Sequence, residues 1–221
     1  MVPAEVLIVV DRWHAADSPV QAGIAWPRQR WTEAFPTFRH LLDGLPDRLD
    51  RDLVRQQCRS AAESADDAER AFLVVMTWGY GDVGYGPFRV ARILADTPNS
   101  TGRLREAATA VAEGGALAGY EALADRRRSR LKWLGPAFGT KFLHFCTPAG
   151  RSPALILDRL VADWLRDNVG ASFNPVPWNI NEYRRYVDLM TGWSVELGIE
   201  PDQLEACLFT EEAARIGSQW G

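Results

Sequence analysis

The chain has 221 residues, of which 47% are hydrophobic and 24% are charged. This composition is typical of a soluble globular protein with enough apolar residues for a buried core. We expect one compact domain that covers residues 1–221. The net charge of -4 disfavours a nucleic-acid ligand. Local clusters of positive charge, however, matter more for nucleic-acid binding than the net charge does.

The sequence has no feature typical of a membrane or metal protein. No stretch approaches the roughly 18 apolar residues of a membrane span, and the short run 6–10 lacks the basic flank of a signal peptide. We therefore expect a cytoplasmic protein without a membrane partner. The cysteines Cys58, Cys146 and Cys207 lie far apart in the sequence, which disfavours a zinc site, a disulfide framework and an iron–sulfur cluster. No metal and no cofactor is expected.

Taken in chain order, the pattern predicts two short strand-like segments, 5–10 and 23–26, and then helices from about residue 46 onward. Prolines stand at several predicted helix starts and glycines after several predicted ends. The fold class is therefore mostly α, with a short strand-like N-terminal segment. The predicted helices cover residues 47–65, 66–78, 87–96, 101–113, 116–128, 139–146, 159–168, 181–197 and 201–216.

Residues 79–84 read Gly-Tyr-Gly-Asp-Val-Gly and match the glycine pattern of dinucleotide-binding proteins. That fingerprint also needs a preceding strand and an acidic ribose ligand about 20 residues later. The acidic residue is absent, and the preceding residues have a helical pattern. We expect a turn between two helices instead, with Trp78, Tyr80 and Tyr85 packing or lining a cleft.

Residues 131–146 form the most informative segment, Leu-Lys-Trp-Leu-Gly-Pro-Ala-Phe-Gly-Thr-Lys-Phe-Leu-His-Phe-Cys. We predict a helix that runs into a tight turn at 136–139, and a second helix that leaves it. Backbone N–H groups at such a helix start bind phosphate without a charged side chain. An arginine cluster precedes the turn and is either a solvated helix end or part of the same phosphate site. The candidate phosphate-binding residues are Pro136, Ala137, Phe138, Gly139 and Thr140, together with Arg126, Arg127, Arg128 and Arg130.

This segment resembles the helix-hairpin-helix of the base-excision DNA glycosylase superfamily, most closely the 8-oxoguanine DNA glycosylases, whose hairpin reads Pro-Gly-apolar-Gly-Thr-Lys. Lys141 falls on the catalytic lysine of that family, and it is one of only two lysines in the chain. Asp158, 17 residues later, matches an essential aspartate that begins the next helix, where it is also a suitable N-cap. The last-helix pattern Gln-Ala-Val-Leu-Phe is matched by Glu205 to Phe209. The resemblance covers the C-terminal half well and the N-terminal half poorly.

The resemblance implies a DNA glycosylase with AP lyase activity, built from two helical subdomains around a cleft. Lys141 would attack C1′ of the sugar and form a Schiff base, while Asp158 would stabilise the cationic sugar and move protons. The damaged base would be flipped out of the duplex. Glu205 would accept the N1–H and N2–H of a guanine-type base, and Phe209 and Phe145 would stack on it.

Three departures from the family limit what the resemblance implies about the substrate. Ala137 replaces the first hairpin glycine, Leu160 stands where the eukaryotic enzymes have a histidine, and no counterpart of their β domain is recognisable. Two alternatives therefore stay open: a non-catalytic helix-hairpin-helix DNA-binding protein, or an enzyme for hypermodified guanine or a free or RNA-borne base, as in bacterial phage defence. The joint presence of Lys141 and Asp158 favours an enzyme. The isolated histidines His14, His40 and His144 are expected to have packing or surface roles.

Overall fold

The computed structural model describes residues 1–217, and the predicted mostly helical fold class is confirmed. Two short strands, β1 (Ile24–Ala25) and β2 (Arg48–Leu49), pair antiparallel, with Ile24 opposite Leu49. A 3-10 turn, η1, covers Pro36–Phe38. The α-helices of the described residues are α1 (Ala4–Ala15), α2 (Arg28–Ala34), α3 (Arg39–Asp43), α4 (Arg51–Gln57), α5 (Ala65–Tyr80), α6 (Gly86–Ala95), α7 (Ser100–Ala124), α8 (Pro136–Cys146), α9 (Arg159–Val169), α10 (Ile180–Leu197) and α11 (Pro201–Arg215).

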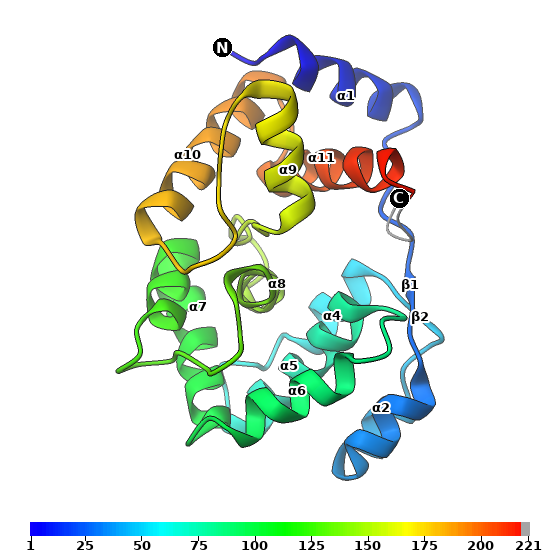
Figure 1. Cartoon of the computed structure of the whole chain (residues 1–221), viewed down its shortest axis with the longest axis vertical. Helices are drawn as coiled ribbons and strands as arrows, with labels where there is room; N and C mark the ends of the chain where they lie inside the picture. The colour runs from blue at the N-terminus through cyan, green and yellow to red at the C-terminus, as the bar shows by residue number, and fades with distance from the viewer. Residues whose placement is uncertain (218–221) are drawn as a thin grey trace.

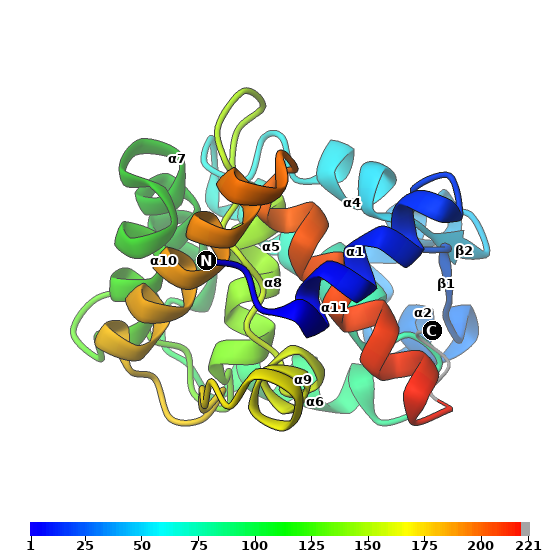
Figure 2. The same cartoon turned by 90° about the horizontal axis from the view of Figure 1, so that it is seen from above.

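Helix α8 lies between two groups of helices (Figure 1). One group contains α1, α9, α10 and α11, in which α9, α10 and α1 all pack on α11; Figure 2 shows α1 crossing over α11. The other group contains α2 to α6, and α8 packs against α5 of this group and against α7. Every residue of α8 from Gly139 to Cys146 is buried. The central helix therefore carries Lys141 and His144 into the interior.

The predicted strand at residues 5–10 is wrong, because these residues belong to α1. Val6, Val9 and Val10 are buried against the core, whereas Leu7 and Ile8 are about half exposed. A spacing of three and four residues between buried positions is that of a helix with one covered face. The continuous apolar run concealed this helical period. Three further helical segments, α2, η1 and α3, also lie in the region before residue 46 where no helix was expected.

The predicted helix 47–65 is much shorter in the structure. The chain first forms β2, and Asp50 then caps α4 by accepting a hydrogen bond from the Leu53 N–H at 2.8 Å. Residues 58–63 form turns, and Ser64 caps α5 in the same way through the Asp67 N–H. Two capping residues thus divide one periodic stretch into two helices. The later helices α9, α10 and α11 lie within one residue of their predicted bounds.

The glycine pattern at 79–84 follows a helix, since Gly79 and Tyr80 are the last residues of α5. This confirms the expected helical context and contradicts a strand-based dinucleotide site. The two helices predicted at 101–113 and 116–128 are joined in α7, which is interrupted at Gly115, where φ is 77°, and ends at Ala124. None of the helices within residues 1–217 has the length and apolar character needed to cross a bilayer.

Candidate active site

Helix α8 begins three residues earlier than predicted. Gly135 is its N-cap and Pro136 its first residue, so residues 136–139 form the first helical turn rather than a loop. The Gly139 N–H donates to the Gly135 carbonyl at 2.9 Å. The first helical hydrogen bond of α8 is the one donated by Gly139, so the N–H groups of Ala137 and Phe138 have no partner within the helix. Pro136 has no N–H group. The candidate phosphate site is therefore narrower than the sequence predicted.

Gly139 is required by close packing. A Cβ at this position would lie 2.4 Å from the Trp178 ring, which is too close for any side chain. The Trp178 indole N–H donates to the Leu134 carbonyl at 3.2 Å, so the ring is fixed against the start of α8. Close packing against Trp178 thus accounts for the glycine before Thr140 and Lys141.

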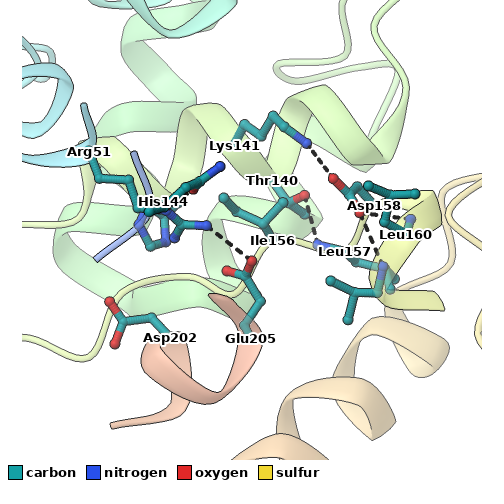
Figure 3. Close-up of polar contacts among 12 residues, drawn as sticks. Arg51, Thr140, Lys141, His144, Ile156, Leu157, Asp158, Leu160, Asp202 and Glu205 are labelled. Atoms are coloured by element: carbon teal, nitrogen blue, oxygen red, sulfur yellow. Dashed lines mark hydrogen bonds and ion pairs between the residues drawn. The ribbon is translucent and has the colours of Figure 1, made fainter. Parts of the chain in front are cut away.

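One face of α8 holds an extended segment, residues 154–158, which ends at Asp158 (Figure 3). The Thr140 hydroxyl accepts from the Leu157 N–H at 3.2 Å and donates to the Pro136 carbonyl at 2.9 Å. The His144 Nδ1–H donates to the Ala154 carbonyl at 2.9 Å, and the Thr147 hydroxyl accepts from the Ala154 N–H at 3.2 Å. The spacing 140, 144, 147 places these three side chains on one helical face.

Helix α10 supports the same segment from another side. The Tyr183 and Tyr186 hydroxyls donate to the carbonyls of Leu155 and Ile156 at 2.9 and 3.0 Å. Residues 154–157 are almost completely buried and have no neighbouring strand, so side chains satisfy backbone groups that a sheet would otherwise pair. This arrangement fixes Asp158 relative to α8.

We predict that Thr140→Val lowers the free energy of unfolding by about 1–3 kcal/mol, because it leaves the buried Leu157 N–H without an acceptor. Thr77→Val is the matched control. Thr77 is equally buried, but its hydroxyl donates only to the Leu73 carbonyl of its own helix, so its loss leaves no unpaired donor. Urea denaturation of both variants measures the difference, and equal losses would show that the Thr140 hydroxyl does not support the segment.

Lys141 and Asp158 form a buried ion pair, with Nζ and Oδ2 2.9 Å apart and side chains 9% and 11% exposed. Asp158 is the N-cap of α9, and its Oδ1 accepts from the N–H groups of Leu160 and Val161. The two carboxylate oxygens therefore have separate tasks, one toward the helix and one toward the lysine. The start of α9 also favours a negative charge through its backbone dipole.

The opposite face of α8 meets the end of α5. The Lys141 Nζ lies 5.5 Å from the centre of the Phe138 ring, which stacks on Tyr80 at 4.3 Å. A Cβ on Gly79 would lie 3.0 Å from Phe138 and 3.3 Å from the Lys141 chain. The first glycine of the 79–84 pattern thus lets α5 approach the lysine closely.

Glu205 is fully buried, and its Oε1 pairs with the Arg51 guanidinium at 3.3 Å (Figure 3). Burial raises the pKa of the Glu205 carboxyl, an effect that the charge of Arg51 opposes and the charge of Asp158 reinforces. The Oε2 atom is buried without a hydrogen-bond partner in the described part of the chain. The charge of Lys141 acts on the Glu205 carboxyl in the same direction as that of Arg51, and lowers its pKa.

The candidate stacking residues Phe145 and Phe209 are both buried, at 1% and 6% exposure. The Phe145 ring meets the Trp78 ring edge-on, with centroids 5.0 Å apart, and also contacts His144. In this structure Phe145 therefore has a packing role, and the sandwich of a base between the two phenylalanines stays a prediction.

The predicted arginine cluster divides into two parts. Arg126, Arg127 and Arg128 are exposed, and Arg128 pairs with Glu106 at 3.0 Å. Arg130 is partly buried, donates to the Ala124 carbonyl at 3.2 Å and lies over the Trp178 ring. The exposed arginines remain candidates for phosphate contact, whereas Arg130 also holds the connection between α7 and α8.

His144 is fully buried, and its pKa lies well below the usual 6.5 because of burial and then the nearby charges of Arg51 and Arg55. Its Nδ1–H donates to Ala154, and its Nε2 faces the Arg55 guanidinium at 3.3 Å as an acceptor. The neutral ring therefore has a packing role, as predicted.

Since the unfolded chain takes up a proton at His144 near pH 6.5 and the folded protein does not, we expect stability to be lost as the pH falls below that value. His144→Asn keeps a donor for Ala154 but does not titrate, so its stability should change less between about pH 7 and pH 5. Urea denaturation at several pH values gives the slope. Parallel slopes for the two proteins would contradict a neutral buried His144.

No group of three or more His, Cys, Asp or Glu side chains within residues 1–217 is arranged to hold a metal ion. The Lys141–Asp158 pair offers amine and carboxylate chemistry. An amine next to a carboxylate can lose its proton to that neighbour and then act as a nucleophile.

The resemblance to DNA glycosylases predicted a mostly helical protein and named Lys141 and Asp158 as its catalytic residues. The structure has this fold and brings the two side chains together. A family model described as "Putative 8-oxoguanine DNA glycosylase OGG-like protein" matches residues 17–209. The chain belongs to this family, and the predicted resemblance is confirmed. Neither a curated protein nor a solved structure matches the chain significantly.

Sequence reasoning missed Arg51 and Gln21 as neighbours of the site. Arg51 lies 154 residues from its partner Glu205, in a stretch predicted as the interior of one long helix. The Asp50 cap, which places Arg51 at the first helical position, is the one signal in the sequence that pointed to a different local structure.

Proposed function

We propose that this protein is a DNA glycosylase with AP lyase activity that removes an oxidised or otherwise modified guanine-type base. Membership of the OGG-like family supports a glycosylase. The observation that carries the proposal is the buried contact of 2.9 Å between the Lys141 amine and the Asp158 carboxylate, because this pair supplies both a nucleophile and a proton acceptor.

In the proposed reaction Asp158 takes the proton from the Lys141 ammonium, and the free amine attacks C1′ of the nucleotide. The new C–N bond forms as the glycosidic bond breaks, and the base leaves with the bonding electron pair and the proton that Asp158 had taken. The nitrogen bound to C1′ then gives a proton to O4′ as the sugar ring opens to the Schiff base. Transfer of a C2′ proton to the Asp158 carboxylate expels the 3′ phosphate by β-elimination and cuts the strand. The Asp158 carboxylate also stabilises positive charge that develops on the sugar.

Glu205 reads the flipped base in this proposal, and Phe209 one helical turn later covers its ring. The exposed Arg126 and Arg127, together with the free N–H groups at the start of α8, contact the phosphates of duplex DNA. Because Oε1 of Glu205 is shared with Arg51, Oε2 is the acceptor that is left for a donor of the base.

Single-turnover excision from duplexes that carry 8-oxoguanine, hypoxanthine or uracil tests this function. We expect release of 8-oxoguanine to be fastest, and strand cleavage to occur without added alkali. Tight binding without release of any base would instead support the non-catalytic DNA-binding alternative. Faster release of uracil would contradict a guanine-type pocket.

A further inference from the structure

Arg51 reaches into the candidate site from the start of α4. Its Nε donates to the Gln21 Oε1 at 3.0 Å, and one terminal nitrogen donates to the Glu205 Oε1 at 3.3 Å. The guanidinium carbon lies 5.6 Å from the centre of the Trp78 ring, and the side chain is only 16% exposed. Figure 3 shows Arg51 and Glu205 pointing toward each other, and the Lys141–Asp158 pair on the other side of Ile156.

The contact between Arg51 and Glu205 leaves hydrogen-bonding groups of both residues available to a ligand. Arginine has five N–H donors, and within the described residues its bonds to Gln21 and Glu205 use two of them. On the other side, the Glu205 Oε2 is buried and has no partner there. A buried carboxylate oxygen without a donor is unfavourable, so a ligand that supplies a donor to Glu205 and an acceptor to Arg51 would satisfy both residues.

The Watson–Crick edge of guanine has this arrangement, because it presents N2–H, N1–H and then the O6 oxygen in a row. If N2–H donates to Oε2 and N1–H to Oε1, the O6 oxygen falls on the Oε1 side of the carboxylate. Arg51 stands on that same side, next to Oε1. Oε1 accepts two hydrogen bonds in this arrangement, which its lone pairs allow.

We propose that Arg51 is a specificity-determining residue that donates a hydrogen bond to O6 of the flipped base, beside Glu205. This inference rests on the proposed glycosylase function and makes it more specific. The substrate class is then a purine with the complete guanine edge, O6, N1–H and N2–H, whose modification lies on the opposite, imidazole side of the ring. Gln21 acts as a positioning residue, because its bond to Nε turns the terminal nitrogens of Arg51 toward Glu205.

The test compares 8-oxoguanine with its 6-thio analogue, whose sulfur is a weaker acceptor at the same position, in single-turnover excision from duplex DNA. We expect the sulfur to slow wild-type excision by about tenfold to hundredfold, since a hydrogen bond from a charged donor is weakened. In Arg51→Met, which removes the donors but keeps an unbranched side chain as far as the position of Nε, excision of 8-oxoguanine should fall by a similar factor. The sulfur should then cause no further loss.

Two controls separate this role from a structural one. Arg55→Met removes a neighbouring guanidinium that faces His144 and Asp202, and it should keep the full wild-type penalty for sulfur. Arg51→Lys keeps a cation near Glu205 and is measured with the same two substrates. It provides a second Arg51 variant in case Arg51→Met does not fold. An unchanged penalty for sulfur in folded Arg51→Met, or faster excision by this variant, would overturn the inference and leave Arg51 only as a counter-ion of Glu205.

Trapping on a preformed abasic site with borohydride distinguishes this failure from failure of the proposed function, because that reaction needs Lys141 but no base. We expect trapping by Arg51→Met at the wild-type level. Trapping combined with no excision of 8-oxoguanine by the wild-type protein would refute the guanine-edge assignment alone. Absence of both trapping and excision would refute the function and the inference together.

Discussion

Replacement of Lys141 by glutamine should abolish base release and strand cleavage, because within residues 1–217 no other amine pairs with the Asp158 carboxylate. Lys132 is the only other lysine of the chain and is exposed, so Lys132→Gln is the matched control. Single-turnover assays on an 8-oxoguanine duplex measure both variants. We expect Lys132→Gln to retain the wild-type rate, with at most a weaker affinity for DNA at low salt.

The Lys141 variant also removes one partner of a buried ion pair, so its folding is checked by thermal denaturation. Activity of a folded Lys141→Gln protein near the wild-type rate would show that the covalent step uses another group or does not exist.

Asp158→Asn should slow base excision by about a hundredfold or more, because the amide neither accepts the lysine proton nor stabilises a cationic sugar as a charge does. Its Oδ1 still caps α9 through Leu160 and Val161, so the helix start is retained. DNA binding should change little. Asp163→Asn on the same helix, whose carboxylate pairs with the exposed Arg166, is the control for loss of a charge.

Equal rates for the two aspartate variants would reduce Asp158 to a helix cap. A loss of DNA affinity in Asp158→Asn that matches its loss of rate would contradict a role in the chemical step as well, since the proposed reaction places the carboxylate at the sugar after binding.

Local signals predicted the C-terminal helices closely, because caps and periodicity agree there. Asp158 begins α9 and Gly170 ends it in a left-handed conformation, and Gly198 ends α10 in the same way. The N-terminal part was predicted poorly. In α1 a run of apolar residues hides which of them face the core, and only the contact with α11 decides this.

The Lys141–Asp158 pair was predicted from the resemblance, and the structure brings the two side chains together. The helix start at Pro136 was missed, because proline and glycine within four residues are typical of a loop as well as of a helix beginning. The neighbours of Glu205 were unpredictable for another reason. Gln21 and Arg51 reach it through the tertiary fold, and no spacing in the sequence relates them.

The most direct test of the central claim is to locate the covalent bond itself. The wild-type protein is reduced with borohydride on a duplex that contains an abasic site, digested, and analysed by peptide mass spectrometry. The chain offers three amines, those of Met1, Lys132 and Lys141, and we predict the sugar adduct on Lys141 alone. An adduct on Met1 or Lys132, or no adduct at all, would contradict a Schiff-base mechanism at the buried lysine.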